Sequence, residues 1–101
     1  METFLPRVLM VEDSQPLSAV YSSYLKNENI SLRNAYNGHT ALDLIHAFKP
    51  HIILLDLYLP DISGFEILNH IKTNRLDILV VVITGSDSVE DAADVMRYIT
   101  G

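Results

Sequence analysis

Residues 52–60 read IILLDLYLP, an aliphatic run that carries a single carboxylate, Asp56, near its end. The run is apolar enough to be buried on both faces, and continuous apolar strands are typical of a parallel sheet that is covered on both sides. A buried carboxylate without a partner is costly. Asp56 is therefore expected either to leave the core where the strand ends or to meet a positive charge.

Three other segments also have the pattern of strands, and each of the four is followed by a helical pattern. The expected strands cover residues 7–11, 30–36, 52–56 and 78–84. The expected helices follow Asp13 and Ser14, follow the turn pair Asn37 and Gly38, cover residues 65–73, and follow Ser86 or Asp87. This alternation predicts βαβ crossovers around a parallel sheet, and hence a three-layer α/β/α sandwich.

The first expected helix has a recurring apolar pattern. Its apolar residues are spaced three and four apart, which predicts an amphipathic helix. They are Leu17, Val20, Tyr21, Tyr24 and Leu25.

Composition favours a single domain and excludes several function classes. The 101 residues are 49% hydrophobic and 20% charged, and they carry a formal net charge of −6 and no cysteine. Disulfides, thiolate metal sites and thiol nucleophiles are thereby excluded, and no basic surface for direct nucleic-acid binding is expected. No apolar run reaches the roughly 20 residues that span a bilayer, and the first residues lack the pattern of a signal peptide. We expect a cytoplasmic protein without a membrane segment.

Acidic and hydroxyl side chains stand at the ends of three expected strands. Glu12 and Asp13 follow the first, Asp56 ends the third, and Thr84 with Gly85 ends the fourth. In an open parallel sheet, ligands collect at the carboxyl ends of the strands. Three carboxylates gathered there repel one another, and no basic residue is close to them in sequence. A hard divalent cation is expected to offset this repulsion, and Mg²⁺ suits such an oxygen-rich site.

This arrangement suggests phosphoryl chemistry. A carboxylate of Asp56 whose charge is partly offset by a cation can attack phosphorus and form an acyl phosphate. The hydroxyl of Thr84 could donate to the phosphoryl oxygens, and Gly85 would let the backbone come close. Taken singly, each of these residues has an ordinary reading as a helix cap or a solvated strand end. Their joint placement at three strand ends favours a site.

Three motifs carry a resemblance to a known family. They are VLMVEDS with Glu12 and Asp13, LLDLYLPDISG with Asp56, Pro60 and Gly64, and VVVITGSDS with Thr84. Together they resemble the receiver domains of bacterial two-component response regulators. The resemblance implies a flavodoxin-like (CheY-like) doubly wound sheet with strand order 2-1-3-4. The continuation DSVEDAADVMRYITG is similar to NtrC-like receivers, which precede sigma-54-activating ATPase modules, and to their LuxO-type branch.

The resemblance also implies roles for individual residues. Asp56 would accept a phosphoryl group from a sensor histidine kinase or a histidine phosphotransfer protein. Glu12, Asp13, Asp56 and the backbone carbonyl of Tyr58 would hold Mg²⁺, and Thr84 would be the switch hydroxyl. The domain would control a downstream ATPase or DNA-binding output module in transcription regulation and would not itself be an enzyme.

Two alternatives remain open. One is a degenerate module that binds partners or dimerises without phosphorylation. The other is a metal-dependent phosphatase with an aspartyl-phosphate intermediate. The phosphatase is less favoured because Tyr58 occupies the position, two residues after the nucleophile, where such enzymes commonly need a second acid.

The end of the sequence raises a further expectation. Receivers of this family continue into a fifth strand and a fifth helix, and they carry a lysine that pairs with the acceptor. Since the sequence stops at Gly101, residues 1–101 are expected to be a C-terminally incomplete receiver domain. The fourth strand would then be an edge that exposes unpaired backbone groups. This predicts a homodimer, formed edge to edge through the fourth strand or by exchange of terminal elements.

Overall fold

Strands and helices alternate strictly along residues 4–83, the part of the chain that the computed structural model describes. The strands are β1 (Arg7–Val11), β2 (Ser31–Ala35), β3 (Ile52–Leu55) and β4 (Leu79–Val82). The helices are α1 (Gln15–Leu25), α2 (Gly38–Ala47) and α3 (Gly64–Thr73). Each expected element within residues 4–83 is thus present, with bounds that shift by a few residues at most. The expected final helix lies outside the described residues.

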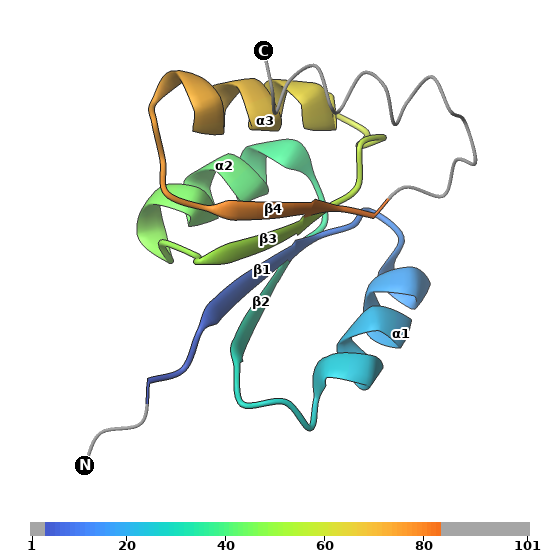
Figure 1. Ribbon diagram of the computed structural model, residues 1–101. Helices are drawn as coiled ribbons and strands as arrows, with labels where there is room; N and C mark the ends of the chain where they lie inside the picture. The colour runs from blue at the N-terminus through green and yellow to red at the C-terminus, as the bar shows by residue number, and fades with distance from the viewer. Residues whose placement is uncertain (1–3, 84–101) are drawn as a thin grey trace.

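The four strands form one parallel sheet in the order β2-β1-β3-β4. Helix α1 covers one face, and α2 with α3 covers the other (Figure 1). The predicted three-layer sandwich and strand order 2-1-3-4 are confirmed. None of the helices in the described part is long and apolar enough to cross a bilayer.

The main apolar core lies between the sheet and the pair α2 and α3. In each strand the residues facing these helices alternate with residues facing α1, as the period of two along a strand requires. The core comprises Leu9, Val11, Ala35, Ala41, Ile45, Ile53, Leu55, Leu57, Ile67, Leu68 and Ile71. Because β1 and β3 are central in the sheet and covered on this side, their ends are held firmly in place.

Helix α1 buries only part of the apolar pattern that the sequence shows. Leu17 and Tyr24 are 44% and 79% exposed, and Val20 is also exposed. The one fully buried residue of α1 is Ser18, whose hydroxyl lies 3.7 Å from the sulfur of Met10 in β1. A small residue lets the helix approach the sheet closely. Tyr21 and Leu25, three and seven residues after Ser18, are half-buried on the same side of the helix.

Polar side chains at the N-cap fix the start of each helix. The Asn37 side chain accepts a hydrogen bond from the N–H of Thr40 at 2.8 Å, as an N-cap residue does. Ser14 and Ser63 play the same part for α1 and α3. The expected turn at Asn37 and Gly38 is therefore the beginning of α2, with Gly38 as its first helical residue.

Candidate functional site

The carboxylates of Glu12, Asp13 and Asp56 meet at the carboxyl ends of the central strands. One oxygen from each lies within 4.8 Å of the others. Two unit charges about 5 Å apart repel by roughly 3 kcal/mol at an effective protein dielectric near 20. Three acids at this spacing form a strongly negative pocket, and the expected convergence of these residues is confirmed.

The register of the sheet brings the acids together. Val11 of β1 and Leu55 of β3 are direct partners, and the N–H of Asp56 donates to the carbonyl of Val11 at 2.9 Å. On the other side of β1, the N–H of Glu12 donates to the carbonyl of Ala35 at 3.1 Å. Sheet hydrogen bonding thus continues one residue past β1 and β3. The acids therefore lie side by side, as residues of adjacent parallel strands do.

Two of the acids are buried, and burial makes their charge expensive. Glu12 is 5% exposed and Asp56 is 7% exposed, whereas Asp13 is open to solvent. Burial and a hydrogen bond with Asp56 raise the pKa of Glu12 to about 7, although the N–H of Ser14 donates to its Oε2 at 3.2 Å and acts in the opposite direction. The pocket therefore favours any species that offsets negative charge, either a proton or a cation.

The donor set fits a hard divalent cation. Carboxylate oxygens are the ligands that Mg²⁺ prefers, and Mg²⁺ usually takes only a few protein ligands while keeping several waters. Exposed Asp13 leaves one side of the cluster open for such waters. Glu12, Asp13 and Asp56 are the residues that could hold the ion.

The segment after β3 contacts the carboxylate of Asp56 directly. The N–H of Tyr58 donates to Oδ1 of Asp56 at 3.1 Å, and the side chain of Tyr58 is exposed. The N–H of Gly64 donates a hydrogen bond to the carbonyl of Leu57 at 2.8 Å. A Cβ on Gly64 would lie 2.6 Å from the Cα of Leu57 and 2.7 Å from the carbonyl oxygen of Asp56. The segment can close this tightly only because residue 64 has no side chain.

Sequence reasoning missed one member of this region. Asp61 has no part in the sequence interpretation, yet its carboxylate accepts hydrogen bonds from the N–H groups of Gly38 and His39 at 2.7 and 2.9 Å. Nothing in the spacing of Asp61 signals a contact with a helix more than twenty residues earlier. The predicted residues Thr84 and Gly85 lie outside the described residues.

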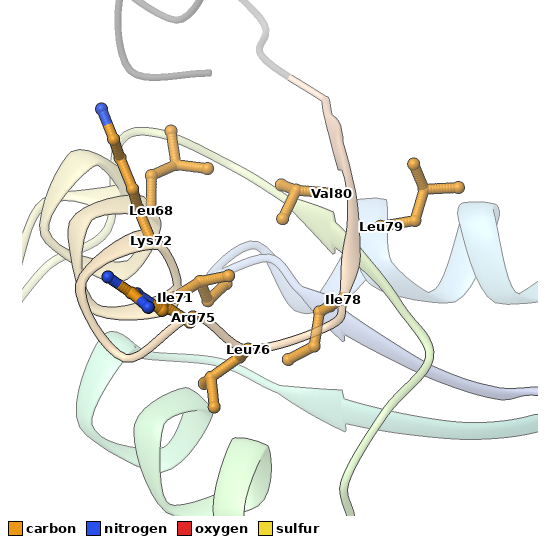
Figure 2. A pocket seen from close by; sticks show the side chains of 8 residues that line it. All are labelled: Leu68, Ile71, Lys72, Arg75, Leu76, Ile78, Leu79 and Val80. Carbon is orange, nitrogen blue, oxygen red and sulfur yellow. The ribbon is translucent and has the colours of Figure 1, made fainter. Parts of the chain in front are cut away.

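An apolar groove elsewhere on the molecule is separate from the acids. A cavity of about 370 Å³ lies between α3 and β4, where Val80 points toward α3 and Leu79 points to the other face of the sheet (Figure 2). Lys72 and Arg75 belong to its lining. It begins at the amino end of β4, opposite the edge that carries the acids, so it plays no part in their chemistry.

An open parallel sheet with acids at the carboxyl ends of its central strands defines a class, the flavodoxin-like α/β domains with an acidic pocket. The family model of the response regulator receiver domain matches residues 8–99. The chain therefore belongs to the response regulator receiver domain family, and the resemblance seen in its motifs is confirmed.

Individual relatives agree with this assignment. The chain is 35% identical over 89 residues to the regulatory protein LuxO of Vibrio vulnificus (strain YJ016), a match that covers 88% of this chain and 20% of that protein. The chain thus spans about a fifth of the length of this curated relative.

Solved structures give the same result. The signal receiver domain of a putative LuxO repressor protein from Vibrio parahaemolyticus is 37% identical, with a TM-score of 0.89 over 94% of this chain and 73% of that one. The signal receiver domain of a DNA binding response regulator protein (merR) from Colwellia psychrerythraea 34H is 27% identical. Its TM-score is 0.85, over 92% of this chain and 79% of the other.

Proposed function

We propose that this domain accepts a phosphoryl group on Asp56 and transmits that event as a signal in a two-component pathway. The observation that carries the proposal is the convergence of Glu12, Asp13 and Asp56 within 4.8 Å. A buried acceptor between two further acids is poised to use a cation, and the family assignment supplies the phosphoryl chemistry.

The reaction is a substitution at phosphorus. A carboxylate oxygen of Asp56 attacks the phosphorus of a phosphohistidine donor, a P–O bond forms, and the P–N bond to the donor imidazole breaks. The leaving imidazole takes up a proton. Bound Mg²⁺ would offset the charge of the acids and of the phosphoryl oxygens. The N–H of Tyr58, 3.1 Å from Oδ1 of Asp56, helps to hold that oxygen so that the other can attack.

The family and the relatives support a proposal for the donor and the output. We propose a sensor histidine kinase or a histidine phosphotransfer protein as donor, in the cytoplasm, and a downstream output module of the sigma-54-activating type. Similarity to LuxO proteins, which are named regulatory proteins, supports a role in transcription regulation. We assign Tyr58, through its backbone carbonyl, to the Mg²⁺ ligands and Thr84 and Gly85 to the phosphoryl contacts by their motif positions.

The test uses a small-molecule phosphodonor with Mg²⁺ and mass spectrometry of the intact chain. We expect a gain of one phosphoryl mass that disappears in Asp56→Asn and when Mg²⁺ is chelated. No gain in the wild-type chain would contradict the proposal and favour a phosphorylation-independent interaction module. Steady release of inorganic phosphate over many turnovers would favour the phosphatase.

We also propose that the domain associates with a second copy through β4. Among the described strands β4 pairs with β3 alone, and two of its apolar residues are exposed, Leu79 by 62% and Val81 by 41%. An apolar sheet edge is a template for pairing with another chain. Sedimentation at increasing concentration is expected to show a dimer that Leu79→Lys together with Val81→Lys weakens. A monomer at all concentrations would refute this association.

A further inference from the structure

Asp61 joins the segment after β3 to the beginning of α2. Its Oδ1 accepts the N–H of Gly38 at 2.7 Å, and its Oδ2 accepts the N–H of His39 at 2.9 Å. These are two of the N–H groups at a helix start that have no partner within the helix. A carboxylate there is also favoured by the helix dipole. One side chain thus caps a helix from a distant segment with both of its oxygens.

The electrostatics of Asp61 agree with a permanent contact. Partial burial acts to raise the pKa of Asp61, but the backbone N–H donors, led by those of Gly38 and His39, lower it to about 2. The carboxylate is therefore charged throughout the physiological range. The ring of His39 also lies near, with its Nε2 3.8 Å from Oδ2.

The two segments touch so closely that a side chain at position 38 would force the side chain of Ile62 to move. A Cβ built on Gly38 would collide with Cγ1 of Ile62 and would lie 3.2 Å from Oδ1 of Asp61. Residues 61 and 62 therefore rest directly on the first turn of α2. This contact holds residues 61 and 62 against α2, while the hydrogen bond from the N–H of Gly64 to the carbonyl of Leu57 joins the two ends of the same segment.

The segment held in this way leads straight to the acceptor. Residues 56–63 connect β3 to α3, and Asp61 is five residues from Asp56. Between them lies Tyr58, whose N–H donates to Oδ1 of Asp56. A shift of the segment would move this donor and the backbone around it, and misplacement of about 1 Å in a reacting site can be costly.

We propose that Asp61 is a positioning residue for the phosphoryl site: by capping α2 it fixes residues 57–63 and thereby the backbone of Tyr58 against Asp56. The proposal rests on the proposed function and deepens it. It separates two roles of one side chain, since Asp61 stabilises α2 as a cap and also orders a segment that belongs to the site.

A matched pair of variants separates these roles. Asp61→Ala removes both the cap and the connection to the site. Asn37→Ala removes a cap of the same helix, the 2.8 Å bond from Thr40, without touching residues 57–63. Both variants should lower the Tm, by about 5 °C for a typical cap. Only Asp61→Ala should weaken Mg²⁺ binding, measured by calorimetric titration with MgCl₂, by about tenfold or more.

Amide hydrogen exchange gives a second readout that does not require metal. In Asp61→Ala the N–H groups of Tyr58 and Gly64 should exchange faster, whereas Asn37→Ala should leave them unchanged. Asp61→Asn keeps one acceptor oxygen and should fall between the wild type and Asp61→Ala in both measurements.

The possible results are distinct. Equal Mg²⁺ affinity in the wild type and in Asp61→Ala, or equal losses in both alanine variants, would overturn the positioning role. A wild-type chain that binds no Mg²⁺ would refute the proposed function instead. In that case the amide exchange experiment still tests the positioning role of Asp61. Unchanged exchange at Tyr58 in Asp61→Ala would refute that role.

Discussion

The backbone N–H of Asp56 donates a 2.9 Å hydrogen bond to the carbonyl of Val11, so Asp56 makes the last hydrogen bond of the ladder between β1 and β3. Its position is set by the backbone ladder and does not depend on its own side chain. Substitutions of the acids should therefore change charge and chemistry while leaving the sheet intact.

Stability of the metal-free protein should fall as pH rises through neutrality. The pKa of Glu12 is raised from 4.5 to about 7 by burial and by Asp56, so the folded state holds a proton that the unfolded chain releases above its own lower pKa. This stabilisation is fully present below about pH 4.5 and is lost as pH rises through 7. Its size is on the order of 2–3 kcal/mol between pH 5 and pH 8. Denaturant unfolding in the presence of a chelator measures it.

The control for this effect is Glu12→Gln. The amide keeps the shape of the side chain but cannot ionise, so the variant should be more stable than the wild type at pH 8 and nearly equal to it at pH 5. An equal stability difference at both pH values would show that the charge of Glu12 is not the cause.

Mg²⁺ affinity should increase with pH over the same range. A cation must displace the proton that Glu12 carries below about pH 7, so binding should be about tenfold weaker at pH 6 than at pH 8. Calorimetric titration in buffers of different ionisation enthalpy should detect proton release at pH 6. A pH-independent affinity would mean that Glu12 is not a ligand.

Gly64→Ala should destabilise the fold more than Gly38→Ala. The added methyl group at position 64 meets backbone atoms of Asp56 and Leu57 at 2.6–2.7 Å, and backbone cannot move aside cheaply. The loss should be about 3 kcal/mol. At position 38 the first obstacle is the side chain of Ile62, which can change rotamer, so about 1 kcal/mol is expected. Urea unfolding of the two variants gives the comparison, and the reverse order would refute this account.

Ser18→Ala should cost about 1 kcal/mol even though the change is small. The hydroxyl of Ser18 accepts a 2.8 Å hydrogen bond from the amide of Asn34 and contacts the sulfur of Met10. Ser22 makes a longer bond to the same amide, at 3.4 Å, and serves as the matched control. Ser22→Ala is expected to change the free energy of unfolding by only a few tenths of a kcal/mol. Equal effects would mean that the buried hydroxyl of Ser18 has no special role.

The sequence predicted the sheet well because its signals are local. The apolar run before Asp56 and the one before Glu12 each mark a buried strand by composition alone. The parallel arrangement follows from the single helical pattern between successive strands, and the meeting of Glu12, Asp13 and Asp56 follows from that arrangement.

What the sequence could not predict depends on distant contacts. Ser18 is buried in α1 while Leu17 and Tyr24 are exposed, because helix orientation is decided by how closely the helix can approach Met10. The cap that Asp61 provides for α2 could not be predicted from the sequence either, because it is also a contact between distant segments. Its partners, Gly38 and His39, are backbone groups of another element, and no side-chain pattern records them.

The strand order has a consequence for synthesis of the protein. The nearest neighbour of β1 on one side is β3, so Arg7 pairs through its N–H with the ring of His51, 44 residues later. A nascent chain emerging from the ribosome therefore exposes Glu12 and Asp13 long before Asp56 can join them. The pocket cannot form before β3 has been synthesised, and a cation bound there would indicate that β1 and β3 have already paired.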